Sequence, residues 1–123
     1  MVGKAVHFTI PIDDPERGIA FYKSAFGWDL RQWGPVDYWS IEGTTGEGID
    51  GGINLRSDDE PSVIVYVEVG DLNEALSAVV DAGGRRASDR MPIPGTGWIA
   101  RVIDTEGNVL GLFQPDKHAS LAN

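Results

Sequence analysis

The chain carries an internal repeat, and this repeat constrains its fold more than any other feature. Residues 6–28 read VHFTIPIDDPERGIAFYKSAFGW, and residues 63–84 read VIVYVEVGDLNEALSAVVDAGG. A shift of 57 positions places Asp14 on Asp71 and Gly27 on Gly84. Each copy has an apolar run typical of a strand, an Asp that can cap a helix, and helical apolar spacing that stops at glycine. We expect two equivalent units that hide their apolar faces together, with the site between them.

The regions after each repeat indicate three further strands per copy. Each half therefore reads β-α-β-β-β, which predicts an α+β fold made of two βαβββ modules. We expect a single domain over 1–123, with module 1 at about 5–56, a linker at 57–60 and module 2 at 61–115. The weakly apolar tail 116–123 is predicted to fray. Segment 91–98 is predicted as a loop, and 43–52 as either a lid or an ordinary hairpin loop.

Composition excludes several classes of function. The chain has 123 residues, no cysteine, and 19 acidic against 10 basic residues, for a net charge of −9. The acidic balance opposes binding to phosphate backbones, so nucleic acid is not expected as a partner. Without cysteine there is no disulfide, thiolate metal ligand or thiol nucleophile. No apolar run is long enough to cross a membrane and the N-terminus does not read as a signal peptide, so we expect a cytoplasmic protein with no membrane partner.

The duplicated βαβββ pattern resembles the vicinal oxygen chelate superfamily, which includes glyoxalases, bleomycin-resistance proteins and extradiol dioxygenases. The segments DDPERGIAFYKSAFGW and MPIPGTGWIARVIDTEGNVLGLFQ carry the resemblance most specifically, within a match over about residues 6–115. The resemblance implies a curved, cup-like mixed sheet with the helices outside and the ligand inside. It also implies a homodimer.

Metal-dependent members of that superfamily use four ligands, and the resemblance places the equivalent positions on one histidine and three residues without a donor side chain. The histidine is His7, and the other positions fall on Gly52, Ile64 and Gly111. One imidazole without a carboxylate is a poor metal site, since catalytic metals of this kind normally have three or more protein ligands. We therefore predict no metal and no other cofactor, and interpret the two glycines as room for a ligand.

Strand alternation assigns side chains to the predicted cup face. His7 and Thr9 share one face of their strand, while Phe8 and Ile10 face the helix. The complete set of predicted ligand-binding residues is His7, Thr9, Asn54, Tyr66, Glu68, Trp98, Arg101 and Phe113.

Several of these residues have an equally simple structural interpretation. His7 can be a pocket acid or base, or only a structural residue. Glu68 can bind ligand or act as a base, or simply be solvated. Arg101 can anchor a carboxylate or form a surface ion pair. Trp98 can stack on a ligand or belong to the core.

Three functions remain open from the sequence. The first is a protein that binds a small organic molecule without metal, and the acidic charge and aromatic content favour a neutral or cationic ligand. The second is a metal-dependent lyase, isomerase or dioxygenase that uses His7 with Asp50 or Glu68. The third is a structural or regulatory module whose cup is filled by its own side chains. Fold alone does not choose between them.

Overall fold

The computed structural model describes residues 2–42 and 48–121, so residues 43–47 of the predicted lid and the last two residues of the tail lie outside it. The chain divides into two compact units. We call residues 7–64 the N-terminal unit, and residues 1–6 together with 65–123 the C-terminal unit. In the described part of the chain, no helix has the length and apolar character needed to cross a membrane.

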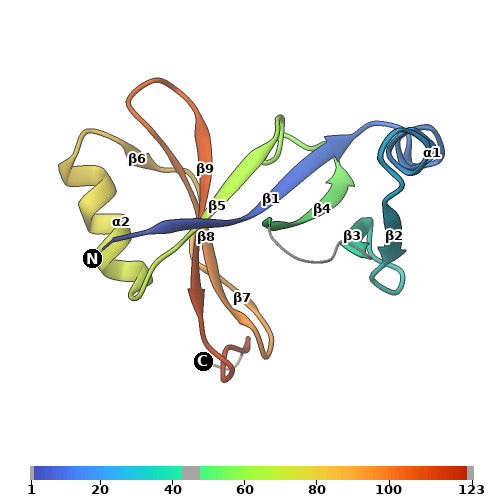
Figure 1. The fold of residues 1–123 in the computed structure, drawn as a ribbon. Coiled ribbons are helices and arrows are strands. Elements are labelled where there is room, and N and C mark those ends of the chain that lie inside the picture. The colour runs from blue at the N-terminus through green and yellow to red at the C-terminus, as the bar shows by residue number, and fades with distance from the viewer. Residues whose placement is uncertain (1, 43–47, 122–123) are drawn as a thin grey trace. The chain divides into compact units, whose positions relative to one another are not determined.

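The N-terminal unit combines one helix with a four-stranded mixed sheet (Figure 1). Its elements are β1 (Lys4–Ile12, from His7 onward in this unit), α1 (Pro15–Phe26), β2 (Asp29–Gln32), β3 (Tyr38–Glu42) and β4 (Asp50–Leu55). The strands lie in the order β2-β3-β4-β1, and β1 is parallel to β4 while the other pairs are antiparallel.

The expected signals delimit α1. The Asp14 carboxylate accepts a hydrogen bond from the Arg17 amide at 3.2 Å, Pro15 begins the helix, and Gly27 ends it with φ at 69°. These features satisfy amide and carbonyl groups that a helix end otherwise leaves open. The helix packs its apolar side against the sheet through a small core. That core consists of Ile12, Trp39 and Ile53, with Ile10, Ile19, Tyr22 and Leu30 partly buried around it.

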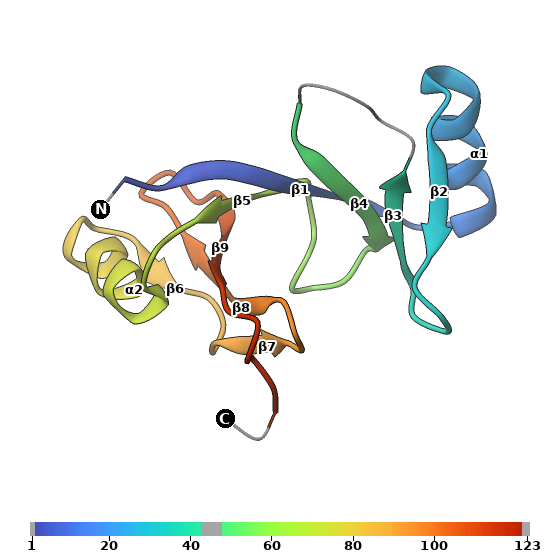
Figure 2. The same cartoon turned by 60° about the horizontal axis from the view of Figure 1, so that its bottom comes forward.

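The C-terminal unit repeats this plan with an additional short strand. Its elements are β5 (Ile64–Glu68, from Val65 onward in this unit), α2 (Leu72–Asp81), β6 (Arg85–Arg86), β7 (Met91–Ile93), β8 (Gly97–Ile103) and β9 (Val109–Pro115). The strand order is β5-β9-β8-β6, with β7 also paired to β8. Helix α2 packs against β6, β8 and β9, as Figure 2 shows from a second side. The predicted α+β class with two βαβββ modules is confirmed.

Two segments of the C-terminal unit differ from the sequence prediction. Met91–Ile93 was predicted as part of a loop, but it forms β7 because its backbone pairs antiparallel with β8. The tail was predicted to fray, but its first residues are anchored. The Asp116 carboxylate accepts a hydrogen bond from the Trp98 indole at 3.1 Å, and Ala119 is 2% exposed within the core. A single well-placed alanine therefore docks a segment that is mostly polar.

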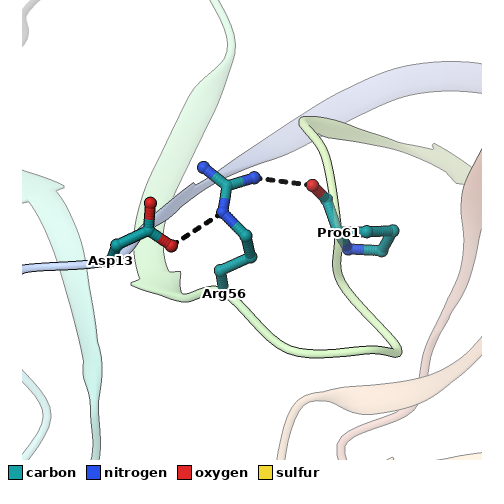
Figure 3. A network of polar contacts seen from close by, with 3 residues as sticks. All are labelled: Asp13, Arg56 and Pro61. Atoms are coloured by element: carbon teal, nitrogen blue, oxygen red, sulfur yellow. Dashed lines mark hydrogen bonds and ion pairs between the residues drawn. The ribbon is translucent and has the colours of Figure 1, made fainter.

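Polar contacts hold the segment after β4 against the N-terminal unit (Figure 3). The Arg56 guanidinium donates to the Asp13 carboxylate at 2.9 Å and to the Pro61 carbonyl at 2.6 Å. The side-chain amide of Asn54 donates to the Glu60 carboxylate. The predicted linker is therefore a turn that the side chains of Asn54 and Arg56 hold in place. The contact with Glu60 in turn orients the Asn54 amide.

Candidate functional site

The sheet of the N-terminal unit has a polar face, opposite the face that packs on α1. Ile10 and Ile12 point toward the core under the helix, so alternation along β1 turns His7 and Thr9 to the other side. The strand register places His7 beside Asp50, Thr9 beside Gly52, and Tyr38 beside Asn54. We call this surface the polar face. It comprises His7, Thr9, Tyr38, Ser40, Asp50, Gly52 and Asn54.

A hydrogen bond crosses this face from β3 to β1. The Tyr38 hydroxyl lies 3.1 Å from His7 Nε2, although β4 separates the two strands. The tyrosine ring can reach across because residue 52 is glycine. A Cβ at this position would lie 2.0 Å from the Tyr38 hydroxyl oxygen and 2.3 Å from its Cζ. Gly52 was predicted to provide room for a ligand, but the protein's own tyrosine occupies that room.

His7 is held as a neutral imidazole in this environment. Burial lowers the pKa of His7 from its usual value, and the nearby Asp50 carboxylate offsets only part of this effect. Desolvation disfavours the charged imidazolium, whereas an anion favours it. A neutral His7 has one nitrogen that accepts a hydrogen bond and one that donates. The neutral imidazole of His7 can therefore hydrogen-bond the Tyr38 hydroxyl as donor or acceptor without adding a positive charge to the face.

Two buried oxygens on the polar face have no hydrogen-bond partner among the residues that the structure describes. They are Thr9 Oγ1 and Asn54 Oδ1. Thr9 is 5% exposed and Asn54 is 7% exposed. Buried polar atoms are normally paired, because an unpaired one costs about 1–3 kcal/mol. Both atoms belong to residues that the sequence predicted to bind ligand.

In the C-terminal unit, Tyr66 and Arg101 flank a second glycine. The register places Tyr66 on β5 beside Gly111 on β9, which in turn lies beside Arg101 on β8. A Cβ at Gly111 would lie 2.5 Å from Cδ2 of the Tyr66 ring. The room predicted over Gly111 is therefore also filled by a tyrosine of the same chain. Arg101 lies on this side of the sheet, opposite the core residues Ala100 and Val102.

Glu68 and Phe113 form the next row of the same surface. Glu68 lies 3.8 Å from the Lys4 ammonium, and the Lys4 side chain is 73% exposed. Such an exposed ion pair contributes little to stability. Phe113 covers Gly97, where a Cβ would lie 2.6 Å from the Phe113 ring. The structure thus brings Tyr66, Arg101, Glu68 and Phe113 together within the C-terminal unit.

Trp98 is not part of this group. It lies in the core on the helix side with Leu72 and Leu76, and only 6% of it is exposed. The Asp116 carboxylate binds its indole N–H, and the Arg90 guanidinium lies 4.3 Å from the centre of its ring. Both its edge and one of its faces are therefore in contact with side chains of this unit, and the structural interpretation describes it better than the ligand-stacking one.

The side chains at the four positions where the resemblance implies metal ligands do not fit a metal ion. His7 Nε2 faces the Tyr38 hydroxyl, and the tyrosine rings lie over Gly52 and Gly111. Ile64 is fully buried and has no donor atom in its side chain. Within residues 2–42 and 48–121, no group of three or more His, Cys, Asp or Glu side chains could hold a metal. His7 and Asp50 lie side by side, but together they supply only two donor residues.

A surface depression of about 340 Å³ lies elsewhere, on the C-terminal unit. It is lined by four consecutive residues, Arg86, Ala87, Ser88 and Asp89. Because a single segment forms it, it does not bring together groups from several elements, as ligand sites usually do. None of the predicted site residues lines it.

Sequence reasoning missed Tyr38 as the partner of His7. The available signal was the alternation in β3, which places Tyr38 and Ser40 on one side and Trp39 in the core. The reach of Tyr38 over Gly52 depends on the register between β3 and β4, which no local pattern reveals.

Known proteins resemble this chain in one N-terminal segment and in overall fold. Residues 4–36 match the family described as bleomycin resistance protein-like N-terminal. No curated protein matches the sequence.

Among solved structures, a glyoxalase/bleomycin resistance protein/dioxygenase superfamily member from Vibrio splendidus shares 14% identity, with a TM-score of 0.67. That match covers 94% of this chain and all of the other. Methylmalonyl-CoA epimerase from Mycobacterium tuberculosis shares 14% identity over 91% of this chain and 87% of its own, with a TM-score of 0.63.

The Streptomyces coelicolor methylmalonyl-CoA epimerase, in complex with 2-nitronate-propionyl-CoA, shares 17% identity over 98% of this chain and 99% of its own. Its TM-score is 0.60. At these identities the likeness establishes the fold alone.

The first prediction concerns Gly52. In Gly52→Ala the new methyl group would collide with the Tyr38 ring, so the tyrosine must leave His7. Overpacking of this kind costs about 1–3 kcal/mol, which urea denaturation would measure as a lower free energy of unfolding. Gly70→Ala is the matched control, since no described atom lies within 4 Å of its Cβ. Equal stabilities for the two variants would contradict the packing of Tyr38 over Gly52.

The second prediction concerns pH. Because burial lowers the pKa of His7, the unfolded chain binds this proton more readily than the folded chain. Acidification through the pKa of an unfolded-state histidine, about 6.5, should therefore lower the free energy of unfolding. The decrease should be smaller in His7→Gln. Urea denaturation between neutral and mildly acidic pH measures the difference between the two proteins. A His7 ring signal in NMR that titrates above the ordinary range would refute the assignment.

Proposed function

We propose that the chain is a member of the vicinal oxygen chelate superfamily and that it binds a small organic molecule without a metal ion. The match over residues 4–36 and the likeness of fold support this proposal. The proposed site is the polar face of the N-terminal unit. In this proposal Thr9 and Asn54 hydrogen-bond the ligand, and His7 with Tyr38 forms one wall of the site.

The observation that carries the proposal is the pair of buried, unpartnered oxygens, Thr9 Oγ1 and Asn54 Oδ1. A chain that only needed a stable fold would gain by replacing such groups with apolar ones. Their position on one face, beside a neutral histidine, favours a ligand that supplies the missing hydrogen bonds. Binding sites commonly keep groups that reduce the stability of the free protein.

The metal-dependent alternative, a lyase, isomerase or dioxygenase, receives less support. It would need donors beyond His7 and Asp50, and the tyrosine rings lie where the family's further ligands would be. Likeness to the two epimerases is likeness of fold, so their reaction is not transferred to this chain.

The third possibility, a module filled by its own side chains, has one specific observation in its favour. Tyr38 fills the room over Gly52, and Tyr66 fills the room over Gly111. If the two tyrosine rings stay in these positions and no ligand binds, the polar face has only a structural role. The two buried oxygens argue against that role, because a purely structural filling leaves them unpaired.

Tyr66, Glu68, Arg101 and Phe113 are proposed as ligand contacts of the C-terminal unit. The homodimer rests on the family resemblance, and the cytoplasmic location rests on composition.

The third prediction tests the site with Thr9→Val, which replaces a hydroxyl by a methyl of nearly the same shape. If the Thr9 hydroxyl is unpaired until a ligand binds, its removal should stabilise the ligand-free protein. The free energy of unfolding of Thr9→Val should then exceed that of the wild type by about 1 kcal/mol. In ligand-detected NMR with a fragment library, the wild type should bind fragments that Thr9→Val does not bind.

Thr9→Ser is the control, since it keeps the hydroxyl and should keep the binding. If Thr9→Val is less stable than the wild type and binds the same fragments, Thr9 is a structural residue and the site is not on this face. That outcome would favour the self-filled module.

A further inference from the structure

We propose that the polar face selects ligands that carry an N–H donor and are neutral or cationic, such as a carboxamide or an amidine, and that it rejects carboxylates. This inference rests on the proposed function and specifies the chemical class of its ligand. It follows from the fixed orientation of Asn54, from the position of Thr9, and from the charges on the face.

The orientation of the Asn54 amide is determined by its neighbour. Its Nδ2 donates to the Glu60 carboxylate, and an ionised carboxylate only accepts hydrogen bonds. The nitrogen must therefore face Glu60, which leaves Oδ1 as the end of the amide without a partner in the described structure. An amide oxygen only accepts hydrogen bonds. The ligand atom that pairs with it must be a donor.

Thr9 complements this acceptor. It lies on β1 beside Gly52, and Asn54 lies two residues beyond Gly52 on β4. Thr9 and Asn54 are therefore one strand spacing and two residues apart, which separates their Cα atoms by about 8 Å. A carboxamide with one hydrogen bond at each end spans a comparable distance, so one small polar group can contact both oxygens. A hydroxyl can donate as well as accept. A carboxamide can thus donate its N–H to Asn54 Oδ1 and accept from the Thr9 hydroxyl, and both buried oxygens become paired.

The charges on the face oppose an anion. Alternation along β2, β3 and β4 places the carboxylates of Asp29, Glu42 and Asp50 on the same side as Ser40. Alternation places Arg31 with them, beside Ser40. Arg56 follows two residues after Asn54, and its guanidinium is paired with the Asp13 carboxylate at 2.9 Å. Glu60 adds a further carboxylate at Asn54. A ligand carboxylate would meet this excess of negative charge and would offer Asn54 Oδ1 no donor.

A natural reporter lies next to the site. The Trp33 ring centre is 5.2 Å from that of Tyr38, and Trp33 is 53% exposed. A ligand that contacts Tyr38 should therefore shift the indole N–H signal of Trp33 in an NMR spectrum. The side-chain amide of Asn54 gives a second signal, at the acceptor itself.

The test is an NMR titration of the full chain with four matched benzene derivatives. Benzamide is neutral with an N–H donor, benzamidine is cationic with N–H donors, acetophenone replaces the amide nitrogen by a methyl group, and benzoate is the anion. We expect benzamide and benzamidine to shift the Trp33 and Asn54 signals saturably. Acetophenone and benzoate should bind at least about tenfold more weakly, because each leaves Asn54 Oδ1 unpaired.

Thr9→Val separates the two levels of the proposal. If the wild type prefers benzamide to acetophenone and Thr9→Val no longer binds benzamide, the result supports both the proposed site and the donor requirement. If acetophenone or benzoate binds the wild type as tightly as benzamide, and Thr9→Val abolishes that binding, the site stands and the donor requirement is overturned. If no probe binds, or if binding is unchanged in Thr9→Val, the proposed site itself is overturned.

Discussion

The packing of the Tyr38 ring across Gly52 onto His7 is the contact on which the polar face depends. It joins β3 to β1 over the intervening strand β4, and it is possible only because residue 52 has no side chain. His7 is partly buried at this contact, and burial lowers the pKa of its imidazole, which favours the neutral form. The missing Cβ at residue 52 thus determines where the Tyr38 ring lies and allows its hydroxyl to reach His7.

In the proposed function, a hydrogen-bonding surface takes the place of a metal site. At two positions where metal-dependent relatives are expected to carry ligands, this chain has glycine with a tyrosine ring over it. In the N-terminal unit the result is a face with a fixed acceptor at Asn54, a hydroxyl at Thr9 and an excess of carboxylates. If this face binds a ligand as proposed, the ligand would pair the buried polar atoms, and selectivity would come from the cost of leaving them unpaired.

The sequence predicted the parts of this architecture that depend on local patterns. The caps at Asp14 and Asp71 and the alternation of His7 and Thr9 with Ile10 all follow from neighbouring residues. The partners over Gly52 and Gly111 could not be predicted, because they depend on the register between strands. The anchoring of Ala119 depends likewise on a distant core. Trp98 had a local signal, since it alternates with Ala100 and Val102 on the apolar side of β8.

The central claim is that the polar face functions without a metal ion, and elemental analysis tests it most directly. The chain would be expressed with added Zn²⁺, Ni²⁺ or Mn²⁺, purified, and assayed for bound metal and for its Tm with and without EDTA. We predict far less than one ion per chain and an unchanged Tm, because one histidine beside one carboxylate supplies too few donors. One tightly held ion per chain, lost in His7→Ala together with the EDTA sensitivity of the Tm, would contradict the account.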